Sequence, residues 1–234
     1  MFIELPMPRY AVYFAPTASS LLWQKGCRWL GRDPERDLLL EQPVIDGLSA
    51  RIEQITASPR GYGLHATLKA PFALASGYKE DDLHEAFVAF AAARRALTLP
   101  KLQVSVLDGF LALTPVAPSA ELNELAAACV TQFDHFRRSA DPAEIGRRLR
   151  TSLTANQREM LSRWGYPYVL NEYRFHMTLT DRLAPADAAG ISRWLSDYFG
   201  EALAEPLAVN DIALFVQPEP SSPFRLDKRF PLQA

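Results

Sequence analysis

An internal repeat constrains the fold of this 234-residue chain more than any other feature of its sequence. Two runs of alternating polar and apolar residues, at 61–72 and 173–183, each contain the pattern His-x-Thr-Leu. In each half of the chain this run lies at the same place within a series of expected strands and helices. A repeat of about half the chain predicts two similar lobes, whereas a solenoid would show several shorter repeats.

Apolar spacing, capping residues and turn signals predict where the elements lie. Strands are expected at 9–16, 61–72, 102–107, 110–116, 173–183, 208–217 and 224–232. Helices are expected at 19–31, 79–96, 119–136, 155–164 and 185–199, with a short basic helix that begins at Asp141 and Pro142. Asp108 and Gly109 predict a tight hairpin turn. Residues 32–60 are less regular and are expected to form a loop with one or two short helices.

This order of elements predicts an α+β fold in a single domain over residues 1–234. One lobe is expected at approximately 8–109 and the other at approximately 110–234. We expect each lobe to be an antiparallel sheet with helices on its outer side, and a central cleft to lie between the lobes.

The charge and composition of the chain restrict its partners. The 25 basic and 27 acidic residues nearly balance, which disfavours bulk nucleic-acid binding but allows a small anionic substrate at a local basic spot. The two cysteines, Cys27 and Cys129, are far apart and form no zinc-binding pattern, so neither a metal nor another cofactor is expected. The sequence shows neither a signal peptide nor an apolar run of membrane-spanning length, so we expect a cytoplasmic protein without membrane contact. The oligomeric state stays open.

The two His-x-Thr-Leu strands each predict one polar face, because residues two apart in a strand point to the same side. These faces carry His65, Thr67 and Lys69 in the first strand, and Arg174, His176, Thr178 and Thr180 in the second. The apolar residues between them point to the opposite side and are expected to join the core of each lobe. Two lobes related by an approximate twofold axis would set the polar faces across a shared groove.

Two facing histidines favour the cleavage of a phosphoester. One imidazole can take a proton from water while the other protonates the leaving oxygen, and a pKa near 6.5 suits both tasks. Threonine hydroxyls can donate hydrogen bonds to phosphoryl oxygens, and Lys69 or Arg174 can offset the developing negative charge. This chemistry needs no metal, and the rate is expected to pass through a maximum near neutrality.

Two His-x-Thr-Leu strands in a duplicated α+β chain resemble the two-histidine (2H) phosphoesterase superfamily, which includes RNA 2′,3′-cyclic phosphodiesterases and bacterial RNA-ligase-like proteins. The segments 28–33 (RWLGRD), 62–72 and 164–183 are most similar to a family of phosphonate-metabolism proteins (DUF1045-like). The resemblance implies that His65 and His176 are catalytic and that Thr67 and Thr178 bind phosphate. Leu64 departs from the phenylalanine that is common in the family, at a position expected to face the core.

The resemblance leaves the substrate open. It favours a metal-independent phosphodiesterase that acts on a small, ribose-based cyclic phosphate in phosphonate catabolism. The alternatives are an RNA 2′,3′-cyclic phosphodiesterase or ligase-like enzyme acting on RNA ends, and a non-catalytic sensor of a phosphorylated metabolite. Substrate contact and simple packing are both open for Tyr62, Tyr166 and Tyr168, and the basic segment 137–152 fits either a substrate-facing rim or a solvated helix face.

Overall fold

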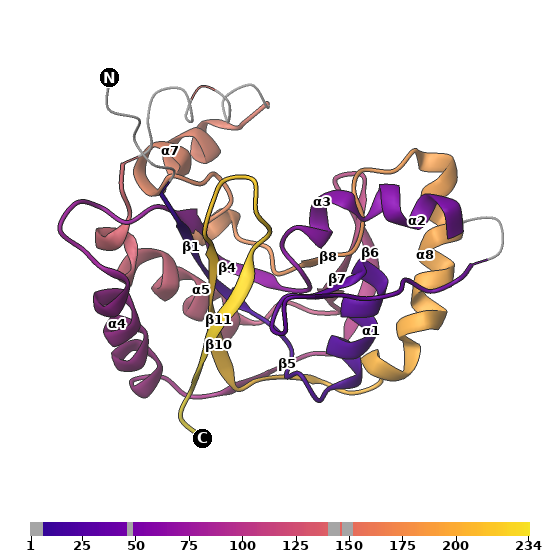
Figure 1. Cartoon of the computed structure of the whole chain (residues 1–234), viewed down its shortest axis with the longest axis horizontal. Coiled ribbons are helices and arrows are strands. Elements are labelled where there is room, and N and C mark those ends of the chain that lie inside the picture. The colour runs from indigo at the N-terminus through magenta and orange to yellow at the C-terminus, as the bar shows by residue number, and fades with distance from the viewer. Residues whose placement is uncertain (1–6, 46–48, 140–145, 147–151) are drawn as a thin grey trace.

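The computed structural model describes residues 7–45, 49–139, 146 and 152–234, and it centres on one seven-stranded sheet with the order β11-β10-β1-β4-β8-β7-β6 (Figure 1). The strands are β1 (Arg9–Phe14), β4 (Ala66–Phe72), β6 (Leu102–Leu107), β7 (Phe110–Pro115), β8 (Met177–Thr178), β10 (Asp211–Gln217) and β11 (Arg225–Pro231). Two small pairs are added by β2 (Arg32–Asp33) with β3 (Leu38–Leu39), and by β5 (Leu97–Leu99) with β9 (Leu207–Val209). Every pairing between these strands is antiparallel. The predicted α+β class with antiparallel strands is confirmed.

The helices begin and end close to where the sequence predicts. They are α1 (Leu21–Leu30), α2 (Ser49–Ile55), α3 (Ala57–Arg60), α4 (Glu80–Ala92), α5 (Ala120–Gln132), α7 (Ala155–Trp164) and α8 (Pro185–Phe199), with the 3₁₀ turns η1 (Asp134–Phe136), η2 (Leu170–Glu172) and η3 (Gly200–Leu203). Thr154 and Gln157 form a reciprocal capping box at the start of α7, which satisfies backbone N–H groups that would otherwise lack partners. The basic helix expected at Asp141 and Pro142 lies outside the described residues. Among the described residues, no helix is both long and apolar enough to cross a bilayer.

The sheet has two halves that meet where Ala66 of β4 pairs with Met177 of β8. One half contains β11, β10, β1 and β4, and the other contains β8, β7 and β6. The strand pairing does not follow the boundary expected between the two lobes at residues 109 and 110, because strands from each side of it pair with strands from the other side. The C-terminal strands β10 and β11 join the half of β1, whereas β6 from the first part of the chain pairs with β7. The alternation of side chains sets which face of a strand is buried, but it does not set which strand lies beside it.

Helices cover the two halves of the sheet from different parts of the chain. α4 packs against β11 and α5 against β4, while α8 packs against β6 and β7 (Figure 1). The α5 helix therefore covers the half of β4 although it follows β7 in sequence. The expected helices on the outer side are present.

β1 separates two apolar clusters because its side chains alternate. Tyr10, Val12 and Phe14 belong to the large cluster under α4 and α5, where each such side chain contributes roughly 1.5–3 kcal/mol on burial. Tyr13, on the other face, packs in a smaller cluster with Phe215 and other residues of β10 and β11. This second cluster forms an apolar layer on the inner face of the sheet.

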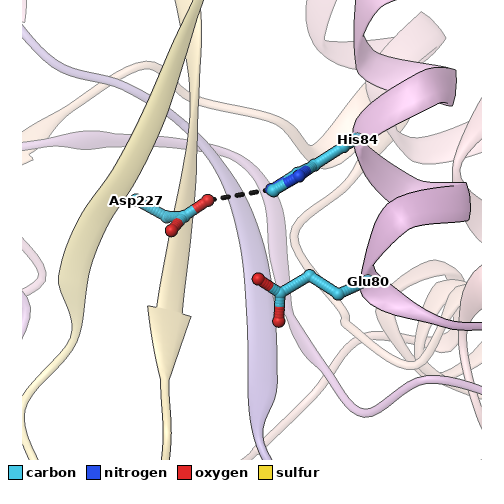
Figure 2. Close-up of side chains that lie close together, drawn as sticks. All are labelled: Glu80, His84 and Asp227. Atoms are coloured by element: carbon cyan, nitrogen blue, oxygen red, sulfur yellow. Dashed lines mark hydrogen bonds and ion pairs between the residues drawn. The ribbon is translucent and has the colours of Figure 1, made fainter.

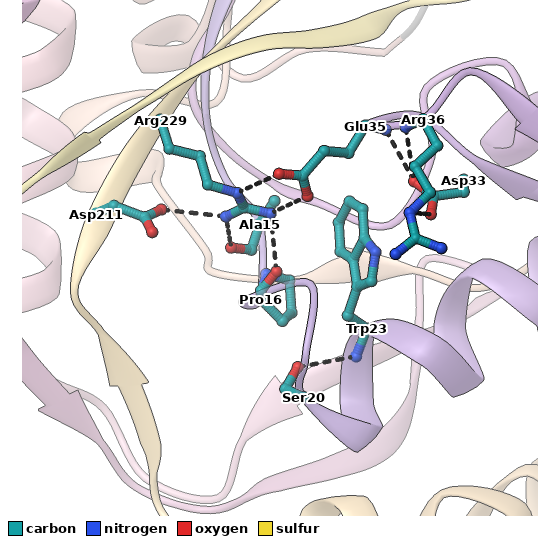
Figure 3. Close-up of polar contacts among 9 residues, drawn as sticks. All are labelled: Ala15, Pro16, Ser20, Trp23, Asp33, Glu35, Arg36, Asp211 and Arg229. Atoms are coloured by element: carbon teal, nitrogen blue, oxygen red, sulfur yellow. Dashed lines mark hydrogen bonds and ion pairs between the residues drawn. The ribbon is translucent and has the colours of Figure 1, made fainter.

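Arg229 of β11 connects this half of the sheet to the loops that follow β1 and β2 (Figure 3). Its guanidinium donates to the backbone oxygens of Ala15 and Pro16 at 2.8 and 3.0 Å. It also pairs with Glu35 at 3.0 Å and Asp211 at 3.3 Å. Because the arginine is largely buried and fully paired, it fixes the position of the edge strand relative to the end of β1.

Candidate functional site

The junction of the two sheet halves places the two histidines on one face. His65 and His176 directly precede the two residues that pair across the junction. When this register is extended by one residue, His65 lies opposite Thr178, and Thr67 lies opposite His176. Residues directly opposite in an antiparallel pair have Cβ atoms about 4.5–5.5 Å apart, and diagonal neighbours such as the two histidines are roughly 7–8 Å apart. That spacing leaves room for one phosphoryl group between the rings.

All four of these residues line a single cavity of about 380 Å³. The other walls are formed by Arg9 and Tyr13 of β1, Ser58, Pro59, Tyr62 and Gly63 around the end of α3, Ala70 and Pro71 of β4, Phe110 of β7, Tyr166, and Thr180, Asp181 and Arg182 after β8. The structure therefore brings together His65, Thr67, His176 and Thr178, as the alternation of the two strands predicts.

His65 is held by three contacts. Its Nδ1 donates to the backbone oxygen of Gly63 at 2.9 Å, because a carbonyl oxygen can only accept. This bond leaves Nε2 as the unprotonated nitrogen of the neutral ring, 3.3 Å from the Thr67 hydroxyl. The imidazole also stacks on Tyr13, with ring centroids 3.8 Å apart and an angle of 21° between the rings.

The surroundings of His65 keep its ring neutral. Burial lowers the pKa of His65 to about 4, and repulsion from a charged His176 acts in the same direction. The hydrogen bond that His65 donates to the backbone oxygen of Gly63 opposes this shift. At neutral pH His65 is therefore unprotonated at Nε2 and suited to accept a proton.

Gly63 supplies this backbone bond from a conformation that favours glycine. Its φ is +75°, and an added Cβ would lie 2.4 Å from Cγ of Pro34. The turn before the first histidine strand therefore combines a left-handed residue with a close packing contact. Both features fix the carbonyl that orients His65.

His176 repeats the arrangement of His65 in the other half. Its Nδ1 donates to the backbone oxygen of Arg174 at 2.8 Å, again two residues earlier in the chain. Within the described part of the chain its Nε2 makes no hydrogen bond. Burial lowers the pKa of His176, while the negative charge of Asp108 opposes this shift. Asp108 thus favours the protonated form of His176, whereas no carboxylate of the described residues acts on His65 in this way.

The expectation that Lys69 shares the face of His65 is wrong. The pairing of β1 with β4 shifts register, so that Tyr13 lies opposite Thr67 but Val12 lies opposite Lys69. One extra residue on β4 is a β-bulge, which reverses the alternation beyond it. Lys69 consequently points to the helix side and is only 3% exposed.

Lys69 has a structural role on that side. Its ammonium donates to the backbone oxygen of Val130 and pairs with Asp134, both at 3.0 Å. Burial lowers the pKa of Lys69, and the attraction of Asp134 opposes this shift. These contacts attach the end of α5 to β4, and they leave no cation of β4 in the cavity.

Arg174 is exposed and does not line the cavity. Among the residues that the structure describes, Arg9 and Arg182 supply the cationic side chains there. Arg182 continues the alternation of Thr178 and Thr180 by one further step, so the sequence pattern could have identified it. It makes no hydrogen bond or ion pair with any described residue.

Arg9 donates to Gln217 at 2.7 Å and lies 5.5 Å from the centre of the Phe224 ring, and no sequence signal connects it with the histidines.

The aromatic residues near the motifs divide into two groups. Tyr62 and Tyr166 line the cavity, whereas Tyr168 is 44% exposed and does not. Tyr62 stacks on Phe224, with ring centroids 5.1 Å apart.

Thr180 also lines the cavity, but its hydroxyl accepts a hydrogen bond from the backbone of Leu111 at 2.9 Å. The hydroxyl of Thr180 therefore serves the junction of β7 and β8.

Among the described residues, the group with the spacing of metal ligands is Glu80, His84 and Asp227, which does not line the cavity. Figure 2 shows these side chains between α4 and β11, with a 2.9 Å contact from His84 Nε2 to Asp227. Glu80 also accepts a hydrogen bond from Tyr10 at 2.8 Å. These contacts connect α4 to the edge strand β11 and to β1. They explain why the three side chains lie close together.

Sequence and structure comparisons place the chain among known proteins. Residues 67–225 match the family described as "Protein of unknown function (DUF1045)". The chain is 41% identical over 230 residues, 96% of its length, to a protein of Janthinobacterium sp. (strain Marseille) named ribose 1,5-bisphosphate phosphokinase PhnN. A protein of the same name from Laribacter hongkongensis (strain HLHK9) is 43% identical over 224 residues, 93% of this chain. The matches cover only 51% and 50% of these proteins, so the chain spans about half the length of the curated relatives it matches.

Solved structures with a similar course of the chain include E. coli LigT complexed with 3′-AMP, at 16% identity and a TM-score of 0.45 over 98% of this chain and 99% of that one. LigT in its apo form gives a TM-score of 0.46 at 15% identity, over 99% of this chain and all of that one. The prediction of the family from the sequence motifs is confirmed by the match over residues 67–225 and by the relatives above 40% identity. The chain belongs to the DUF1045 family.

Proposed function

We propose that this protein is a metal-independent phosphodiesterase that opens a small cyclic phosphate of ribose, with His65 and His176 as its acid–base pair. The observation that carries the proposal is the matched placement of two histidine–threonine pairs on one cavity. Each histidine has its Nδ1 bound to the carbonyl two residues earlier and faces the threonine of the other strand. A structural role for either strand would not require this repetition.

We assign the two tasks from the difference between the surroundings of the two rings. Neutral His65 accepts a proton at Nε2 from a water molecule as the water oxygen forms a bond to phosphorus. His176 gives a proton from Nε2 to the sugar oxygen as its bond to phosphorus breaks; burial lowers its pKa too, but the carbonyl of Arg174 and the charge of Asp108 oppose this shift. The products are a phosphate monoester and a free sugar hydroxyl, with no net change in protons on the pair. Each proton transfer is typically worth ~10²–10⁴ in rate.

The remaining residues of the cavity match a phosphoryl group in the transition state. The hydroxyls of Thr67 and Thr178 can donate to its non-bridging oxygens from opposite sides. Arg9 and Arg182 offset negative charge, and such charge-assisted contacts are about twice as strong as neutral ones. A cavity of about 380 Å³ suits a small sugar phosphate, at the lower end of the usual range for ligand sites.

The choice of ribose and of phosphonate catabolism rests on the family resemblance and on the names of the relatives. Those relatives are named for a phosphokinase acting on ribose 1,5-bisphosphate, and they are about twice as long as this chain. The sequence contains no G-x-x-x-x-G-K-[ST] loop, the phosphate-binding loop of many kinases. We therefore assign the kinase activity in the name to the part of the relatives outside the match, and a ribose phosphate to the cavity of this chain.

An enzyme that acts on RNA ends is the second candidate, because Tyr62 and Tyr166 line the cavity and could stack on a base. The test measures ring opening by phosphorus NMR on ribose 1,2-cyclic phosphate and on an oligonucleotide with a 2′,3′-cyclic end. We expect the sugar phosphate to be preferred, with weak dependence on salt. A preference for the oligonucleotide that falls steeply with salt would favour the RNA enzyme. Saturable binding without turnover of either compound would favour a sensor.

A further inference from the structure

Asp181 is a carboxylate in the wall of a cavity that otherwise suits an anion. Its backbone N–H donates to the carbonyl oxygen of Ile55, and its Oδ2 accepts from the backbone N–H of Ser58 at 3.1 Å. Within the described part of the chain, its other oxygen Oδ1 has no hydrogen bond and the residue has no ion pair. The hydroxyl of Ser58, which lines the same wall, also has no partner among the described residues.

The contact with α3 does not account for a full carboxylate. Asn or Ser would accept the backbone N–H of Ser58 as well as Asp does. A second negative charge beside a phosphate is unfavourable by Coulomb repulsion. A carboxylate at this place is compatible with catalysis if it accepts a hydrogen bond from a neutral donor of the substrate.

We infer that Asp181 is a specificity-determining residue that accepts a hydrogen bond, through Oδ1, from a free hydroxyl on the alcohol part of the phosphate ester. The inference rests on the proposed function and adds that the enzyme recognises one free hydroxyl of the sugar. Ser58 completes the contact, because its hydroxyl can donate to the same substrate oxygen. A site built for a hydroxyl rejects the analogue that lacks it, since the acceptor then loses its partner when the ligand covers it.

The test compares ribose 1,2-cyclic phosphate with its 3-deoxy and 5-deoxy analogues. For each compound, kcat/KM is measured with the wild type and with Asp181→Ala. The wild type should prefer the parent over one of the two analogues by ~10–100-fold, the range for a hydrogen bond to a charged group. In Asp181→Ala this ratio should fall to within about threefold of unity, because activity on the parent drops to the level of the analogue. Glu53→Gln is the matched control, since it removes a carboxylate that pairs with Arg60 outside the cavity, and it should keep the ratio.

The outcomes separate the inference from the proposed function. If Asp181 only stabilises α3, its replacement will lower activity on all three compounds alike and leave the ratio unchanged, which overturns the inference. If the wild type opens none of the rings, the proposed function fails. In that case, calorimetry with the same three compounds still decides the inference, because loss of preference in binding on Asp181→Ala would support it and an unchanged preference would refute it.

Discussion

Replacement of His65 by glutamine should remove part of the pH dependence of folding stability. Burial lowers the pKa of His65 in the folded protein to about 4, against about 6.5 in the unfolded chain. Between these values the unfolded state binds more protons than the folded state, so the free energy of unfolding rises with pH over this window. The stabilisation is lost as the pH falls from 6.5 toward 4.

The linkage relation gives the size of this effect. At pH 5 the mismatch of the two pKa values costs the wild type about 2 kcal/mol, and at pH 7 it costs about 0.2 kcal/mol. The part of the ring that faces the cavity is screened by solvent, so these figures are upper limits. The His65→Gln variant lacks this cost at both pH values, whatever its own stability, because a glutamine side chain does not titrate.

The assay is urea unfolding of the wild type and His65→Gln at pH 7 and pH 5, with a histidine NMR titration of the folded wild type. Between the two pH values the wild type should lose about 1–2 kcal/mol more of its free energy of unfolding than the variant. The NMR signal missing from the variant should titrate well below pH 6. Equal losses in the two proteins, or a titration near pH 6.5, would refute the account of a neutral, half-buried His65.

Four further predictions concern the site and its supports. Burial lowers the pKa of both histidines, so the maximum of kcat/KM on the cyclic phosphate should lie on the acidic side of pH 6.5 and not near neutrality, as the unperturbed pKa values suggest. A maximum above pH 7 would contradict this sign. Gly63→Ala should lower the free energy of unfolding in urea by about 1–3 kcal/mol more than Gly77→Ala does, because both have positive φ but only the Cβ at 63 would clash with Pro34. Lys69→Met should leave kcat/KM within about threefold of the wild type. A larger loss would show that Lys69 contributes to the substrate site. Arg182→Gln should raise KM by ~10-fold through the lost contact with the phosphate, and an unchanged KM would remove it from the substrate site.

The local features of the fold were predictable from sequence because they depend on nearby residues. The capping box of α7 and the left-handed turn at Asp108 and Gly109 both follow from residues a few positions apart. The same holds for the two histidine–threonine faces, which need only the alternation of a strand. This alternation persists at 174–176, although the regular strand β8 covers only Met177–Thr178.

The features that sequence reasoning missed depend on contacts between distant segments. The bulge that turns Lys69 away exists only in the pairing of β4 with β1, so the alternation within β4 could not reveal it. Arg9 reaches the cavity because β1 lies beside β4, and the order of strands in the sheet is not encoded in their periodicity. Asp181 lies two residues after the second His-x-Thr-Leu pattern, but its place in the wall depends on α3 from the irregular segment 32–60.

The most direct test of the acid–base pair is the rate of ring opening of ribose 1,2-cyclic phosphate by the wild type, His65→Ala, His176→Ala and the double variant, each with excess EDTA. Each single replacement should lower kcat by ~10²–10⁴, and the double variant should lose less than the product of the two, because the residues act as a unit. EDTA should leave the wild-type rate unchanged. A rate that survives the loss of His176, or that chelation abolishes, would contradict catalysis by the two histidines.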